Sequence, residues 1–137
     1  MTWKLLAAIV IAGTLATFTD WLFMGVLYHG RYLKYPEVWW PGVREKAGDK
    51  RAIFLSCAVG YLTAAGVVEL CALAGASSIT NALLVAFLVW LAGPLVIVVT
   101  NGFWIKTDPA ITIMHAIGYL ARTIIAGIAG AIALQLG

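Results

Sequence analysis

Residues 81–104 read NALLVAFLVWLAGPLVIVVTNGFW, an apolar stretch without a charged side chain. A helix needs roughly 20 such residues to cross a hydrocarbon core about 30 Å thick. The stretches 3–28, 52–74 and 110–136 are also long and predominantly apolar. With 63% hydrophobic residues, 11% charged residues and a mean hydropathy of +0.97, the chain lies far outside the range of soluble globular proteins. The sequence predicts an all-α fold, an integral membrane four-helix transmembrane bundle in a single domain, 1–137.

The first apolar stretch also has features of a secretory signal peptide, because Lys4 precedes an uninterrupted apolar run. Apolar residues resume after Asp20, however, so the stretch is longer than an ordinary signal-peptide core. We therefore expect a retained helix, with cleavage as the alternative.

Basic residues concentrate in and beside one connection, 29–50, whereas the loop 75–80 has none. Positively charged loops stay on the cytoplasmic side of a membrane. The sequence thus predicts a multi-pass protein of the cell inner membrane, with both termini outside and the loop 29–50 in the cytoplasm. The basic residues of this region are Arg31, Lys34, Arg44, Lys46, Lys50 and Arg51.

The middle of this loop is rich in aromatic residues and proline, and reads YPEVWWPG over 35–42. Proline breaks helices, and the rings of Tyr32, Tyr35, Trp39 and Trp40 are of the kind that lies at the level of lipid headgroups. We expect an interfacial segment here. The alternative is a docking surface or a lid over a cytoplasmic opening.

The charge balance bears on partners. A net charge of +3 and a pI near 9.0, most of it from one loop, indicate membrane lipids with anionic headgroups as neighbours and give no support for nucleic acid binding. Small multidrug exporters and fluoride channels also have four short helices, but many insert in both orientations. The strong charge bias here predicts one orientation, so that a homo-oligomer would be parallel; a partner membrane protein remains open.

Three charged residues, Asp20, Glu69 and Arg122, lie inside the apolar stretches. A charge at membrane depth costs roughly 2.5–3.5 kcal/mol on insertion scales, so it normally has a partner. Counting about 1.5 Å per residue from the cytoplasmic helix ends places Arg122 between the two carboxylates in depth. We expect Arg122 to pair with Asp20 or Glu69, and prefer Asp20 because Glu69 is near the outer end.

Helical spacing predicts a polar stripe on the fourth helix, where Thr112, His115, Tyr119 and Arg122 follow one another at steps of three, four and three. Asn101 adds a polar group on the third helix at about the level of His115. The predicted ligand-binding or ion-binding residues are Asp20, Glu69, Asn101, His115, Tyr119 and Arg122.

No cofactor, metal or catalytic motif accompanies these residues. Cys57 and Cys71 would be roughly 21 Å apart on one helix, too far for a disulfide and too few for a zinc or iron–sulfur site. His29 and His115 fall at different depths, which disfavours haem ligation. The sequence therefore predicts no cofactor, no metal, no catalytic residues and no enzyme activity.

Two functions are compatible with a polar cluster inside a small bundle. The first is binding or transport of a small solute, a lipid-like molecule or a proton. The alternative is a non-catalytic structural or accessory subunit of a larger membrane complex, because interhelical polar contacts hold helices together at about 0.6–2 kcal/mol each. A surface of small residues on the fourth helix, which includes Gly118, Gly127 and Ala131, serves close packing either within the chain or between protomers.

The order of these parts resembles an uncharacterised bacterial membrane family, catalogued as domain of unknown function 1761, over nearly the whole chain. The similar stretches are 21–31, 88–93 (LVWLAG), 101–103 (NGF) and 115–119 (HAIGY). The resemblance implies four membrane helices. It implies no activity, and the sequence LYHGR at 27–31 departs from the Trp-Tyr and proline signature of that family.

Overall fold

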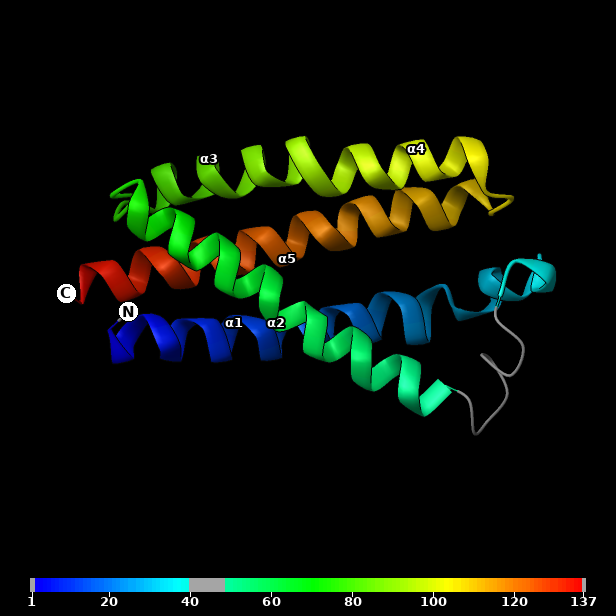
Figure 1. Cartoon of the computed structure of the whole chain (residues 1–137), viewed down its shortest axis with the longest axis horizontal. Helices are drawn as coiled ribbons and strands as arrows, with labels where there is room; N and C mark the ends of the chain where they lie inside the picture. The colour runs from blue at the N-terminus through cyan, green and yellow to red at the C-terminus, as the bar shows by residue number, and fades with distance from the viewer. Residues whose placement is uncertain (1, 40–48, 137) are drawn as a thin grey trace.

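A computed structural model describes residues 2–39 and 49–136, and this part of the chain is helical without any strand. It forms four helical rods, which pack beside one another (Figure 1). The first rod is α1 (Trp3–Asp20) with its continuation η1 (Trp21–Leu27), and the second is α2 (Asp49–Leu73). The third consists of α3 (Ile79–Trp90), η4 (Leu91–Leu95) and α4 (Val96–Trp104), and the fourth is α5 (Pro109–Gln135).

Each rod is long and apolar enough to cross a membrane, over Trp3–Leu27, Lys50–Leu73, Ile79–Trp104 and Pro109–Gln135. Large apolar side chains cover its outer faces. Phe54, Phe103 and Trp104, for example, are 71%, 81% and 85% exposed. An outer surface this apolar is typical of a chain surrounded by lipid. The expectation of four apolar helices is confirmed.

Local sequence signals begin and end the helices. The side chain of Ser78 accepts a hydrogen bond from the backbone N–H of Asn81 at the start of α3 (3.2 Å). The α2 helix ends at Leu73, and Gly75 follows with a positive φ of 62°, while the N–H of Ala76 donates to the carbonyl of Cys71 (2.8 Å). These features form a Schellman turn, which reverses the chain toward α3.

Two rods contain π-helical turns. Proline lacks a backbone N–H and so removes one hydrogen bond from a helix. The structure accommodates Pro94 within η4, and the rod continues into α4. Just before this turn, the indole N–H of Trp90 donates to the carbonyl of Ala116 on α5 (2.8 Å), which joins the third rod to the fourth.

The α5 helix lies at the centre and contacts the other three rods. Its small residues allow close approach. A Cβ on Gly127 would stand 2.9 Å from the carbonyl oxygen of Ala82, and one on Gly130 would stand 3.3 Å from the Cβ of Cys71. The predicted small-residue surface therefore packs inside the chain, against α3 and α2.

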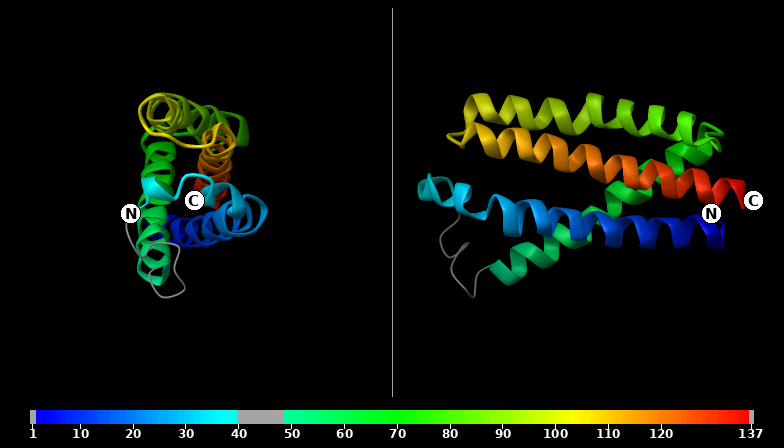
Figure 2. Two further views of the ribbon diagram at one scale, coloured as in Figure 1. Left: turned by 90° about the vertical axis from the view of Figure 1, so that its right-hand side faces the viewer. Right: turned by 180° about the vertical axis from the view of Figure 1, so that it is seen from behind.

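The two ends of the bundle differ (Figures 1 and 2). Both chain termini lie at one end, the terminal end. At the other end lies a short irregular segment, residues 28–39, which we call the strap and which contains η2 (His29–Leu33) and η3 (Pro36–Val38). The α2 helix crosses the bundle diagonally, so that it lies near α3 at the terminal end and diverges from α4 toward the strap end.

Candidate functional site

An ion pair joins the first rod to the fourth. Arg122 of α5 pairs with Asp20, the last residue of α1, as depth along the helices predicted. Both groups are largely withdrawn from solvent, because the side chain of Arg122 is 9% exposed and that of Asp20 is 18% exposed. Within the described residues, Asp20 Oδ1 and Arg122 Nε have no hydrogen-bond partner. The pair thus neutralises its charges without satisfying every polar atom.

The surroundings of Arg122 come from three helices, since Asp20 belongs to α1. Its guanidinium carbon lies 5.4 Å from the centre of the Tyr119 ring of α5, which is the geometry of a cation–π contact. Gly60 of α2 is also close, because a Cβ there would stand 3.7 Å from the guanidinium. Arg122 is therefore held between α1, α2 and a neighbouring turn of its own helix.

His115 is close to two tyrosines. The hydroxyl of Tyr32, from the strap, is 2.8 Å from His115 Nε2, and the two rings meet edge-on at 5.9 Å. The Tyr119 ring, four residues farther along α5, lies 6.1 Å from the imidazole. Tyr32 is only 3% exposed and packs with Ile111 and Met114, so its ring is buried within the protein. Its position at the level of lipid headgroups stays a prediction.

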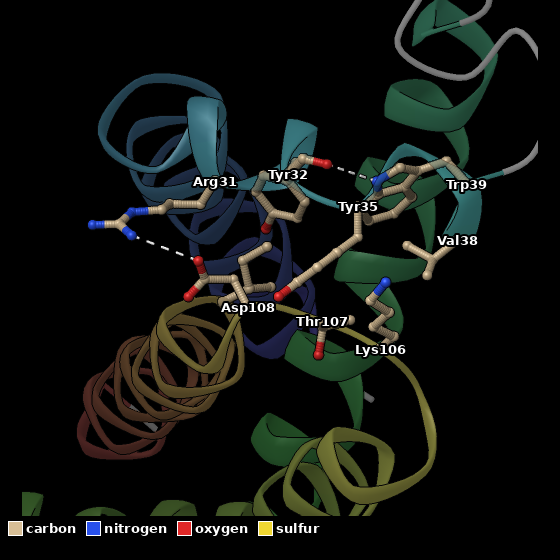
Figure 3. A pocket seen from close by; sticks show the side chains of 9 residues that line it. Arg31, Tyr32, Tyr35, Val38, Trp39, Lys106, Thr107 and Asp108 are labelled. Atoms are coloured by element: carbon tan, nitrogen blue, oxygen red, sulfur yellow. Dashed lines mark hydrogen bonds and ion pairs between the residues drawn. The ribbon is translucent and has the colours of Figure 1, made fainter.

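The strap is fastened to the turn 105–108 by ion pairs (Figure 3). Asp108 Oδ2 receives Lys34 Nζ at 3.2 Å and Arg31 Nη1 at 3.5 Å. Lys106 Nζ lies 3.0 Å from Glu37 Oε1. Of the basic loop 29–50, residues 40–48 lie outside the described part of the chain.

These pairs shift the pKa values of groups at the strap end. The N–H of Ala110 and then Lys34 hold the pKa of Asp108 below its ordinary value, and Asp108 raises the pKa of Lys34. The backbone N–H of Glu37 and the ammonium of Lys106 lower the pKa of Glu37, which in turn raises that of Lys106. Asp108 is the decisive member because it is 4% exposed and also caps α5, accepting the N–H of Ala110 at 2.9 Å.

Trp39 closes the strap on itself. Its indole N–H donates to the carbonyl of Tyr32 (2.8 Å), and the two rings pack at 5.4 Å (Figure 3). The described part of the loop is thus a folded piece of structure that rests on α5. This arrangement resembles the lid alternative more than a segment lying flat at an interface.

Beneath the strap is a cleft of about 510 Å³ between α4 and α5. Of the six predicted site residues, Asn101, His115 and Tyr119 line it, whereas Asp20, Glu69 and Arg122 do not. Tyr119 connects the two groups, since it lines the cleft and also contacts Arg122. The lining residues are Val38, Trp39, Thr63, Pro94, Ile97, Val98, Asn101, Gly102, Ile105, Thr107, Ile111, Thr112, His115 and Tyr119.

Glu69 is separate from this site. It lies on α2 six residues beyond Thr63, or roughly 9 Å farther toward the terminal end. Its Oε1 atom is buried and has no hydrogen-bond partner among the described residues. Glu69 does not line the cleft, and its assignment to a ligand-binding or ion-binding site stays a prediction.

The site includes residues that sequence reasoning missed. Thr63 is the one α2 residue in the described lining of the cleft, and it was not distinguished from other hydroxyl residues of apolar helices. Tyr32 was noticed only as an aromatic residue of the loop. One signal in the sequence could have identified Tyr32. It stands two residues before Lys34, and Lys34 pairs with the oppositely charged Asp108, which directly precedes α5.

The described part of the chain contains no group of three His, Cys, Asp or Glu residues that could hold a metal ion. Cys57 and Cys71 are free thiols on α2. The polar groups of the cleft are therefore hydroxyls, an amide and an imidazole, which are suited to hydrogen bonding.

No protein-family model, curated protein or solved structure matches this chain. The resemblance to the domain of unknown function 1761 family accordingly stays a prediction. What the structure defines is a class: a small helical protein with four rods of membrane-spanning length and a polar-lined cleft at one end.

Proposed function

We propose that this is a multi-pass membrane protein that binds a small molecule in the cleft between α4, α5 and the strap. The observation that carries this proposal is the cleft itself. A volume of about 510 Å³ lies in the range of small-molecule sites, and three predicted site residues, Asn101, His115 and Tyr119, are among its walls. Protein interiors otherwise contain few voids larger than a water molecule.

The proposed orientation follows the distribution of charge. Of the described cations, Arg31, Lys34, Lys106, Lys50 and Arg51 belong to the strap, the turn 105–108 or the start of α2, whereas Lys4 lies at the terminal end and Arg122 inside the bundle. By the positive-inside rule, the strap end is then cytoplasmic and both termini face outward, in the inner membrane of a cell. A single cysteine in place of Ser77, introduced after Cys57 and Cys71 are replaced by serine, should react with an impermeant maleimide added to intact spheroplasts.

The competing function is that of a structural or accessory subunit, in which the polar residues only hold the helices together. The Asp20–Arg122 pair serves either function equally well. The cleft favours binding, because a purely structural bundle gains stability by filling such a space with side chains. A test must therefore act on the cleft and leave the ion pair unchanged.

Native mass spectrometry of the gently solubilised protein provides that test. Val98 lines the cleft, whereas the adjacent Val99 does not line it and is 37% exposed, so V98F and V99F form a matched pair. We expect a reproducible non-protein mass on the wild type and on V99F, and its loss from V98F. The proposal is refuted if the wild type carries no such mass, or carries only another protein, which would favour the accessory role.

A further inference from the structure

The charge of the cleft wall limits the ligand, provided that the cleft is the binding site proposed above. Its polar lining consists of Thr63, Asn101, Thr107, Thr112, His115 and Tyr119. None of the described lining residues is an aspartate, glutamate, lysine or arginine. The wall thus offers hydrogen-bond donors and acceptors without a fixed charge.

The buried charge nearest the wall is already compensated. Arg122 contacts the Tyr119 ring, but its partner is Asp20. At the strap end, Lys106 pairs with Glu37, and Arg31 and Lys34 share Asp108, but all of these side chains except Asp108 are more than half exposed. An ionic ligand inside the cleft would have to separate the Asp20–Arg122 pair or remain without a counter-charge in the described wall, and both are costly at low dielectric.

Half of the polar lining residues belong to α5. Thr112, His115 and Tyr119 follow one face of α5 over roughly 10 Å at 1.5 Å per residue. The third rod contributes an apolar wall, formed by Pro94, Ile97 and Val98, with Asn101 as its polar exception. A pure hydrocarbon would leave the hydroxyls and the imidazole without new partners, which disfavours its binding relative to a ligand that hydrogen-bonds.

The route of entry also favours a molecule from the bilayer. Val38 and Trp39 of the strap cover the strap end of the cleft, and Trp39 is held there by its bond to Tyr32. On the side, α2 diverges from α4 (Figures 1 and 2), and among the described residues it supplies only Thr63 to the lining. The described walls are therefore thinnest between α2 and α4, on the apolar flank of the bundle.

From the uncharged wall, the polar face of α5 opposite an apolar third rod, and the lateral position of the cleft, we propose that the ligand is an uncharged amphiphile taken from the membrane. Its larger part is a ring or hydrocarbon that packs on the third rod. Its hydroxyl or carbonyl groups hydrogen-bond to the polar face of α5. Fatty-acid anions and organic cations are excluded by the absence of a free counter-charge in the described wall.

A matched set of probes tests this ligand class. The probes are radiolabelled para-octylbenzyl alcohol, para-octylbenzoate and para-octylbenzylammonium, which share one ring and chain and differ in charge. Each is titrated at neutral pH into phosphatidylcholine nanodiscs that contain wild-type protein, V98F or V99F. Binding to empty nanodiscs is subtracted, and circular dichroism verifies that both variants fold.

We expect the alcohol to bind wild type and V99F at least about tenfold more tightly than either ion, and to lose its binding in V98F. Tighter binding of the benzoate or the ammonium probe, lost in V98F, would overturn the inference about charge and leave the proposed binding function standing. Failure of all three probes, with a native mass still retained by wild type, would overturn the ligand class alone. Failure of the probes and absence of that mass would overturn both proposals.

Discussion

Neutralising Asp20 should destabilise the bundle, because it leaves the guanidinium of Arg122 buried without its counter-charge. The Arg122 side chain is 9% exposed, so water cannot replace the lost carboxylate. Removing one member of a buried pair costs about 3–5 kcal/mol, and an unpaired charge at membrane depth costs roughly 2.5–3.5 kcal/mol. We therefore expect D20N to lower the free energy of unfolding by about 3 kcal/mol, which is about 160-fold in the unfolding equilibrium constant.

Removing both charges should restore most of this loss. In the double variant D20N/R122Q neither charge is left alone, so we expect a coupling energy of at least about 2 kcal/mol between the two sites. The measurement is equilibrium unfolding in mixed micelles of dodecyl maltoside and sodium dodecyl sulfate, followed by far-ultraviolet circular dichroism.

The chain offers a matched control in Glu69, a carboxylate on α2 for which the described residues show no ion pair. E69Q makes the same change from carboxylate to amide, and we expect it to cost less than about 1 kcal/mol since it separates no such pair. The reasoning is refuted if D20N costs no more than E69Q, or if the effects of D20N and R122Q simply add.

Three further predictions concern other contacts. G13V should lower the melting temperature in detergent by an amount equivalent to about 1–3 kcal/mol, because a Cβ there would stand 2.3 Å from the Tyr61 ring; an unchanged melting temperature would contradict the close approach of α1 to α2. Y32F should cost about 1 kcal/mol and make the strap more sensitive to limited proteolysis, since it removes the hydroxyl bonded to His115. The strap should remain protected above the ordinary pKa of an aspartate and become sensitive to pepsin as the pH falls through the depressed pKa of Asp108, because a lowered folded-state pKa stabilises only while the group is ionised. D108N should remove this pH dependence, and an unaltered profile would mean that another group causes it.

The four rods were predictable because each depends on a long apolar stretch, which is visible in the sequence itself. Apolar residues sustained over 81–104, interrupted by nothing charged, leave few alternatives to a membrane-spanning helix. Helix ends were less predictable. The α2 helix begins at Asp49 rather than at 52, since charged residues such as Lys50 and Arg51 extend a helix that projects beyond its apolar part.

The site was predictable in part, for a physical reason. A buried arginine requires a counter-charge, and this requirement together with depth led from Arg122 to Asp20. Charge alone does not say in which direction a side chain points, so the sequence could not say whether Glu69 reaches the cleft, and the structure shows that it does not line it. Thr63 carries no such requirement, and only the crossing of α2 over the bundle brings it to the cleft.

The α2 helix crosses α5 where Gly130 comes close to Cys71 and Val68, and this crossing is a point about which α2 can tilt. A helix backed by glycine can roll and tilt with little loss of contact, and α2 extends 19 residues from Val68 to Asp49, which is roughly 28 Å of lever arm. A tilt of about 5° at this crossing would move the Asp49 end of α2 by roughly 2.5 Å at that length. Bulkier residues at Gly130 should therefore alter how far the bundle splays at its distant end, and with it the size of the proposed binding cleft, although Gly130 does not line that cleft.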